Sequence, residues 1–529
     1  MKRLPTLSRR AVMWLCLLLL LVSLLPMYAL SLYNHAFYDD MGFSLLTREA
    51  WQRTGSPFAV LEAAIRNTVG IRQTWEGTYS TSFVSTFQPA VFGEGAYWVT
   101  TFLLLTVFLA CVWYFLKQTL RGLYGMDRVT LATVFAILGF VLTQFVPDAA
   151  EAFYWFNGGV AYTLLWSITL LAAGVWLRFE HATGRLRCTL LFVLLILLTV
   201  LVGGAKYSTV LLAVLLAGGF TLWAFRFKRP KRFAYLVLTL LLLAMMVFSI
   251  TAPGNAVRAK TLGGGMSAPK AIMQAIYFGL ALVGHSFSLP LLAALLLLVP
   301  LSIPALRQSP FRFAHPLRVT LLMTALFCAQ LAPTLYTGNY LGDGRVLNTY
   351  HYTLVLMLAQ LTLYWTGYFL RRGERGLTPV FAYDPLAATP SPDPQSPAPV
   401  PAGTAAARSF PPEQRLKAAT LLLAGIMLLV GCVAYHPDGA ASYGPQNMAG
   451  GGALRAILNG QAARFDAAMD ARDALLNDAT LTEVTLTPVT DVPKQFMGDS
   501  LTDENLEYVL RLYADYYDKA VVHAAGQGE

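Results

Sequence analysis

The sequence from residue 11 to residue 32 reads AVMWLCLLLLLVSLLPMYALSL and contains no charged residue. A helix needs about 20 mostly apolar residues to cross the hydrocarbon core of a bilayer. The run is longer than the apolar core of a cleavable signal peptide, which spans about 7–15 residues. The stretch therefore predicts a membrane helix that is retained as an anchor, with Arg9 and Arg10 at its polar edge.

Ten further apolar runs follow the first one along the chain. Hydrophobic residues make up 56% of the sequence and charged residues only 13%, which is about half the charged fraction of an ordinary soluble domain. This composition excludes a soluble globular or a disordered protein and predicts an all-α polytopic membrane protein with about 11 transmembrane helices. We expect these helices at about residues 11–32, 96–116, 129–147, 158–178, 188–203, 206–225, 233–252, 288–306, 319–336, 350–370 and 415–435.

The net charge of +10 comes from basic residues that gather in short clusters between the apolar runs. Lys and Arg concentrate in the short cytoplasmic loops of membrane proteins, so this charge indicates membrane topology and not a nucleic-acid partner. With the N-terminus inside, the inner segments hold most of the 39 Lys and Arg residues. We therefore expect a cytoplasmic N-terminus and a C-terminus on the outer face.

Two outer segments carry helical patterns that do not cross the membrane. The first outer loop, residues 33–95, has amphipathic stretches near 43–53 and 58–72, whose apolar residues recur at helical spacing. Residues 271–287 are apolar, but a further full crossing would reverse the charge pattern of the loops that follow. We expect 271–287 to form a re-entrant or interface-lying helix, and a re-entrant helix requires cover from protein or a water-filled cavity.

The chain divides into a membrane domain, residues 1–372, and three further parts. A disordered inner linker is expected over 373–414, because its Pro, Ala and Ser residues show no apolar period. The last transmembrane helix, 415–435, then leads to a small α/β outer domain over 436–529. The elements expected in that domain are a helix at about 452–476, a strand at 483–487 and a second helix at about 503–522.

Two adjacent carboxylates, Asp39 and Asp40, lie a few residues beyond the first span. A carboxylate at the edge of an apolar cavity has a raised pKa and can act as a general base toward an acceptor hydroxyl. The alternative is structural: Asp40 caps a helix that begins near Met41, where Asn would serve as well, and Asp39 is solvated. Adjacent side chains diverge, so we expect one catalytic and one structural residue, with Asp39 the preferred base.

Other singular polar residues occupy the remaining outer loops. Glu151 lies among aromatic residues whose ring faces suit the stacking of a sugar, although the aromatics also fit an interfacial belt. Arg258 and Arg345 can hold a phosphate with the planar guanidinium; the alternatives are a simple turn and lipid headgroup contact. The candidate substrate-binding residues are Glu151, Lys206, Tyr207, Asn255, Arg258, Asp343 and Arg345.

The sequence shows no convincing signature of a metal or nucleotide site. Each of the five cysteines lies in an apolar run, without a CxxC pair or a histidine at ligand spacing, and they are expected to be apolar fillers. No Walker, GxGxxG, HExxH or GxSxG motif has a suitable setting. We expect no cofactor and no metal site, while a dependence on a divalent metal stays open.

The order of these motifs resembles a bacterial family of uncharacterised polytopic proteins allied to the GT-C glycosyltransferases. The resemblance rests on the acidic pair after the first span, the acidic-aromatic loop after the third, the Ala-Pro-Gly-Asn motif at 252–255 with Arg258, the Gly-Arg-Val-Leu-Asn motif at 344–348, and the C-terminal domain. It covers nearly the whole chain apart from the linker. A Phe at 465 departs from the family, which more usually has Tyr there.

The resemblance implies a GT-C-like glycosyltransferase that spans the cell (inner) membrane and contacts membrane lipid. It implies a polyprenyl-phosphate sugar as donor, a glycan or lipid acceptor on the outer face, and inversion at the anomeric carbon. The catalytic carboxylate of such enzymes lies in the first outer loop, which here means Asp39 or Asp40. Arg258, Arg345 or Lys206 would stabilise the charge on the leaving phosphate. The alternative is a lipid-linked saccharide flippase or transporter, in which the ionisable residues line a translocation path.

Single cysteines at Ser56, Ser396 and Ser442, in a chain without its native cysteines, test the orientation. The charge asymmetry predicts that an impermeant thiol reagent labels Ser56→Cys and Ser442→Cys in intact cells and leaves Ser396→Cys unlabelled. Permeabilised cells are the control in which all three sites react. Labelling of Ser396→Cys in intact cells would contradict the orientation.

Overall fold

The computed structural model describes residues 8–261, 263–285, 288–338, 340–371, 425, 433–435 and 441–525. The linker expected over 373–414 and most of the span expected over 415–435 lie outside these residues. The described chain is nearly all helical and contains two short two-stranded sheets.

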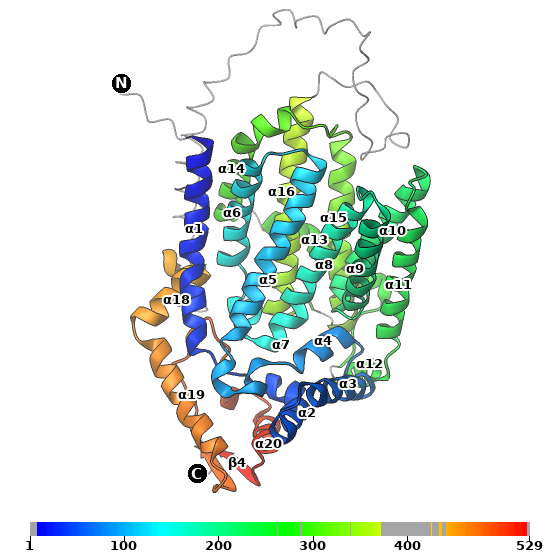
Figure 1. Cartoon of the computed structure of the whole chain (residues 1–529). Coiled ribbons are helices and arrows are strands. Elements are labelled where there is room, and N and C mark those ends of the chain that lie inside the picture. The colour runs from blue at the N-terminus through cyan, green and yellow to red at the C-terminus, as the bar shows by residue number, and fades with distance from the viewer. Residues whose placement is uncertain are drawn as a thin grey trace, which may run out of the picture.

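Nine of the described helices are long and apolar enough to cross a membrane. They are α1 (Arg9–Leu30), α5 (Val99–Leu116), α8 (Leu165–Glu180), α9 (Arg185–Gly203), α10 (Tyr207–Arg226), α11 (Arg232–Ile250), α14 (Leu289–Arg307), α15 (Pro316–Gly338) and α16 (Gly344–Leu370). Figure 1 shows them side by side as one bundle. The prediction of a multi-pass helical membrane protein is confirmed. The third expected span is present as a shorter apolar helix, α6 (Arg128–Gln144).

The outward faces of the bundle are apolar. Leu186 on α9 and Leu222 on α10 are 73% and 74% exposed, and Leu321 on α15 is 62% exposed. Exposed apolar surface on this scale is uncommon on a soluble monomer and marks contact with a partner or a membrane. Because these side chains lie on helices of membrane-crossing length, the surface is suited to contact with lipid.

Helix α13 (Ala268–His285) packs lengthwise on α15. Gly265, just before α13, lies against Tyr336 near the end of α15, and Gly279 lies against Cys328 earlier in that helix. The two helices are therefore antiparallel, and α13 runs into the bundle from the end at which α15 finishes. Helix α13 therefore lies alongside a helix of membrane-crossing length, and the prediction that it is re-entrant stays a prediction.

Four helices close one end of the bundle, which we call the covered end. They are α2 (Tyr38–Thr54), α3 (Pro57–Thr74), α4 (Tyr79–Ser85) and α12 (Pro253–Thr261). Figure 1 shows α2 and α3 lying across the ends of the bundle helices. Helices α2 and α3 contain the two amphipathic stretches expected from the sequence. On α3, Val60 and Ala64 are buried while Phe58 and Val69 are exposed, as in an amphipathic helix at a membrane surface.

The C-terminal segment has both helices and strands. Its elements are α18 (Ala449–Leu458), α19 (Gln461–Asn477), β3 (Glu483–Leu486), α20 (Leu506–Tyr517) and β4 (Val521–Ala524), preceded by the hairpin of β1 (Val433–Tyr435) and β2 (Ala441–Tyr443). The single helix expected over 452–476 is wrong, because Gly460 has a φ of 74° and separates α18 from α19. The helix expected over 503–522 is too long: Asp518, at a φ of 55°, ends α20, and the chain returns as β4 parallel to β3.

The C-terminal segment packs against both the bundle and the covered end. A Cβ on Gly450 of α18 would lie 2.1 Å from the Ser23 carbonyl oxygen of α1, and the Gly450 amide donates to Gln144 Oε1 at 2.8 Å. At the other contact, the Arg48 guanidinium of α2 lies 4.2 Å and 4.5 Å from the ring centroids of Tyr516 and Tyr517. The segment therefore forms one wall of the covered end.

The chain between α3 and α4 is wedged between two interhelical turns. Ser249 Oγ donates to the Gly77 carbonyl at 2.7 Å, and the Ser80 amide donates to the Gly204 carbonyl at 3.1 Å. A Cβ on Gly204 would lie 2.5 Å from the Ser80 amide nitrogen. Because this contact is with the backbone, no side chain can move aside, and position 204 requires glycine.

Gly204→Ala is expected to lower the thermal unfolding midpoint of the purified protein, since overpacking typically costs about 1–3 kcal/mol. Gly218→Ala on α10 is the control, because no atom lies within 4 Å of the Cβ it would add. Scanning fluorimetry in detergent measures both variants. Equal midpoints for the two would show that the 75–80 segment is not held as tightly as described.

Candidate active site

Glu76 is a buried carboxylate at the covered end, with its side chain only 4% exposed. Lys206 Nζ lies 2.9 Å and 2.8 Å from its two oxygens, Arg258 forms a second ion pair with it, and Thr78 Oγ1 donates to it at 2.6 Å. Burial raises the pKa of Glu76, but the charges of Lys206 and Arg258 outweigh burial and hold this pKa at about 2. Two cations therefore share one ionised carboxylate, and the group carries one surplus positive charge.

Asn255 and Tyr207 brace the turn that follows Glu76. Asn255 Oδ1 accepts from the Gly77 amide at 3.0 Å and from the Tyr207 hydroxyl at 3.1 Å. Asn255 Nδ2 donates to the Ser249 and Ile250 carbonyl oxygens, each at 2.9 Å. These contacts use the polar atoms of Asn255, so this residue and Tyr207 hold the loop that carries Glu76.

Arg345, in the first turn of α16, connects this helix to the acidic-aromatic loop that follows α6. Its Nη1 donates to Glu151 Oε1 at 2.6 Å, its backbone amide also donates to Glu151, and its Nη2 donates to Asp343 Oδ2 at 2.9 Å. The guanidinium lies 5.3 Å from the ring centroid of Trp155. Burial raises the pKa of Glu151, and the Arg345 charge opposes that effect. Two carboxylates therefore pair with Arg345 and leave this group one surplus negative charge, whereas the sequence offered only Asp343 as its partner.

Two π-helical segments carry residues of this site. Glu151 lies in η5 (Ala150–Tyr154) and Tyr162 in η6 (Gly159–Leu164). Lys206 Nζ is 5.8 Å from the ring centroid of Tyr162, and the Arg345 charge acts on the same side chain. Tyr162 therefore connects the Glu76 group to the Arg345 group. Single π-helical turns are rare and occur frequently at functional sites.

Asp40 is fully buried and accepts three hydrogen bonds. Its Oδ2 accepts from the Tyr97 hydroxyl at 2.5 Å and the Phe37 amide at 3.1 Å, and its Oδ1 accepts from the Asn157 amide at 2.8 Å. Burial raises the pKa of Asp40 to about 7, although these hydrogen bonds favour the ionised form. Asp40 thus stabilises the start of α2, which begins at Tyr38 and not near Met41.

The carboxylate of Asp39 differs from that of Asp40, since it makes no hydrogen bond with the part of the chain that the structure describes. Burial raises the pKa of Asp39 to about 6; the charge of Arg345 lowers it, the charge of Asp503 raises it, and the charges of Arg258 and Lys206 lower it. These cations come from three segments that are far apart in the sequence: α16, α12 and the turn before α10. The charges of the predicted cations therefore act on Asp39, although each cation pairs directly with another carboxylate.

An apolar cavity of about 360 Å³ lies inside the bundle between α8, α10, α15 and α16. Trp166 and Thr209 are among its lining residues. Trp166 follows Tyr162 by four residues and Thr209 follows Lys206 by three, so the cavity begins about one helical turn from the charged groups. The charged site and the apolar cavity are neighbours along the bundle.

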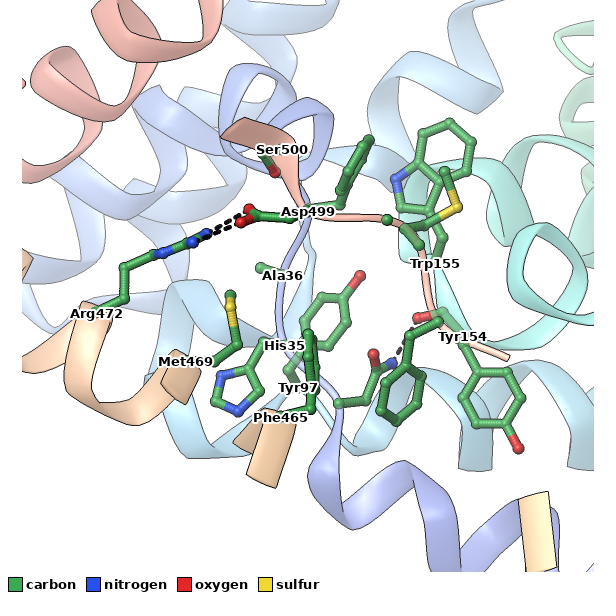
Figure 2. A pocket seen from close by; sticks show the side chains of 15 residues that line it. His35, Ala36, Tyr97, Tyr154, Trp155, Phe465, Met469, Arg472, Asp499 and Ser500 are labelled. Atoms are coloured by element: carbon green, nitrogen blue, oxygen red, sulfur yellow. Dashed lines mark hydrogen bonds and ion pairs between the residues drawn. The ribbon is translucent and has the colours of Figure 1, made fainter. Parts of the chain in front are cut away.

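A second cavity lies between the segment before α2 and the C-terminal segment. Figure 2 shows His35, Tyr97 and Trp155 around it, with the ion pair of Arg472 and Asp499 at its side. Its volume of about 20 Å³ holds about one water molecule. This cavity is too small to hold a sugar.

The sequence reasoning missed Glu76 and Tyr162, the two residues that connect the predicted cations. Glu76 could have been noticed as a lone acid directly after an amphipathic helix, but nothing in the sequence pairs it with Lys206. No family model, curated protein or solved structure matches the chain. The expected likeness to GT-C enzymes therefore stays a prediction.

Asp40→Asn is expected to destabilise the protein by about 1–3 kcal/mol, because Asn has one acceptor oxygen where Asp40 meets three donors. This replaces the expectation from the sequence that Asn would serve equally well there. The thermal unfolding midpoint measures the effect, with Glu62→Gln, an exposed carboxylate on α3, as the control. A midpoint equal to that of the control would contradict the hydrogen-bond network described for Asp40.

Proposed function

We propose that the protein is a membrane glycosyltransferase that moves a sugar from a polyprenyl-phosphate donor to a cell-envelope acceptor. The observation that carries the proposal is the setting of Asp39. This carboxylate has no hydrogen-bond partner among the described residues, and the charges of Arg345, Arg258 and Lys206 act on it together. Glycosyl transfer from a lipid phosphate needs a base for the acceptor and cations for the leaving phosphate, and Asp39 with these three cations would supply both.

Asp39 is suited to be the general base. With a pKa of about 6, it is mostly ionised at neutral pH and is more basic than an ordinary aspartate. In the proposed reaction it accepts the proton of the acceptor hydroxyl while that oxygen forms a bond to the anomeric carbon. The bond between the anomeric carbon and the phosphate oxygen breaks, and the electron pair leaves with the lipid phosphate. A single displacement of this kind inverts the anomeric carbon.

The leaving phosphate is assigned to the side of Arg258 and Lys206. These two cations share Glu76 and keep one surplus positive charge, whereas Arg345 pairs with two carboxylates and its group keeps one surplus negative charge. The Arg258 side chain is 37% exposed and lies over the Trp75 ring, with its guanidinium 5.2 Å from the centroid. Preorganised cations of this kind stabilise charge that develops in a transition state.

The apolar cavity supports a lipid-linked donor. It begins about one helical turn from Lys206 and is lined almost entirely by apolar side chains. A donor lipid could place its phosphate near Lys206 and its isoprenoid chain in this cavity, and so contact both the charged group and the apolar cavity. The positive-inside pattern places the covered end on the outer face, where cell-envelope acceptors are found.

A flippase for a lipid-linked saccharide could use the same cations and cavity but would leave the donor intact. Purified full-length protein in nanodiscs, supplied with a polyprenyl-phosphate sugar and a membrane extract as acceptor, distinguishes the two functions. The proposal predicts release of free polyprenyl phosphate together with a glycosylated acceptor. Movement of intact donor between the leaflets of proteoliposomes, without cleavage, would favour the flippase and contradict the proposal.

Asp39→Asn is expected to reduce turnover by about 10²–10⁴-fold, because the amide cannot accept the proton. In the unaltered protein kcat/KM should fall about tenfold per unit as the pH drops below about 6, where Asp39 becomes protonated. Initial rates between pH 4.5 and 8 measure this profile, with Glu62→Gln as the control. Full activity in Asp39→Asn would remove Asp39 from the role of base.

A further inference from the structure

Helix α19 presents three carboxylates on one face, beside the stretch that leads into α2. Asp466, Asp470 and Asp473 are spaced by four and three residues, which places them on the same side of a helix. His35 lies against this face: its Nε2 is 2.9 Å from Asp466 and 3.9 Å from Asp470, and its Nδ1 is 3.3 Å from Asp473. Figure 2 shows the His35 ring beside Phe465 and Met469, which belong to α19.

The charges of this group do not balance. Three carboxylates face one imidazole, so even a protonated ring leaves two negative charges. The nearby arginines are engaged elsewhere: Arg48 pairs with Glu94, Arg464 with Asp491 and Arg472 with Asp499. A cation from outside the chain would therefore be stabilised here.

Both ring nitrogens of His35 face carboxylates, which suits a protonated ring that donates on both sides and also a neutral ring with a metal ion at Nε2. A neutral imidazole has one N–H group and one nitrogen lone pair, but both ring nitrogens of His35 face carboxylates. If Nδ1–H donates to Asp473, the Nε2 lone pair points at Asp466 and Asp470. Metal-ligating histidines usually donate the other ring N–H to a carboxylate in this way, which fixes the tautomer and raises the basicity of the ligand.

We propose that His35, Asp466 and Asp470 bind a divalent transition-metal ion, with Asp473 orienting the histidine. The three ligand atoms lie within 4.8 Å of one another. Zinc holds nitrogen and oxygen ligands at about 2.0–2.2 Å, so the ligand atoms must move closer together. The Asp470 side chain is 70% exposed and is free to make that movement. One imidazole with carboxylates favours Zn²⁺ or Mn²⁺ over Mg²⁺ or Ca²⁺.

The ion would clamp the C-terminal segment to the chain just before Asp39 and Asp40. Asn34 Nδ2 already anchors this chain to the Tyr154 carbonyl at 2.6 Å. A metal at His35 would add a second anchor between α19 and the start of α2. This site is separate from the proposed glycosyltransferase chemistry and does not depend on it.

Calorimetric titration of the tag-free, full-length protein with Zn²⁺ tests the site. The proposal predicts one ion per chain and a raised thermal unfolding midpoint on binding. Asp470→Asn, which alters a proposed ligand at a largely exposed position, should weaken binding by at least about 10–100-fold, the cost typical for loss of a group that only supports a ligand. His35→Gln should remove the metal-dependent rise of the midpoint.

Asp515→Asn is the control, because Asp515 is an exposed carboxylate on α20 outside this group. It should bind Zn²⁺ as the unaltered protein does. Absence of saturable binding, or equal affinity in Asp470→Asn and the control, would overturn the proposal and leave His35 as an ion-pair partner only. Both readouts are independent of catalysis, so the result stands whether or not the protein transfers sugars.

Discussion

The ion pairs of Glu76 with Lys206 and Arg258 are the interaction on which the covered end depends. A buried carboxylate must be paired, since removal of one partner of a buried ion pair typically costs about 3–5 kcal/mol. Meeting this requirement brings together three segments: the chain after α3, the turn between α9 and α10, and the start of α12. Glycines allow the backbones to approach, because a Cβ on Gly254 would lie 2.5 Å from the Trp75 amide nitrogen. The same pairing fixes Lys206 and Arg258 where they act on Asp39.

The sequence predicted the membrane class and most spans, because each depends on local apolar composition. It also predicted α2 and α3, whose apolar residues follow a helical period. The break between α18 and α19 was missed because the apolar residues continue across Gly460, and the return of the chain as β4 depends on pairing with β3. The sequence placed Asp40 as the cap of a helix near Met41, whereas Phe37 is the N-cap of α2 and Asp40 lies in its first turn; the three donors to Asp40 come from separate segments and could not be predicted.

The candidate site was predictable as a set of residues and not as a geometry. The sequence identified the cations because each stands alone in a loop next to an apolar run. It could not show that Glu76 and Glu151 neutralise part of their charge, since these pairs join residues 130 and 194 positions apart. In the structure two carboxylates outnumber Arg345, Asn255 and Tyr207 hold a loop, and the surplus positive charge lies with Arg258 and Lys206.

The affinity of the protein for polyprenyl phosphate, compared with that for the uncharged polyprenol, tests the central claim most directly. Both lipids offer the same chain to the apolar cavity, so the difference isolates the phosphate. We predict that the phosphate binds at least about tenfold more tightly, and that Arg258→Ala removes most of this difference, a loss of about 1.5–3 kcal/mol for a charge-assisted hydrogen bond. Equal affinity for the two lipids in nanodiscs would contradict a phosphate site at these cations.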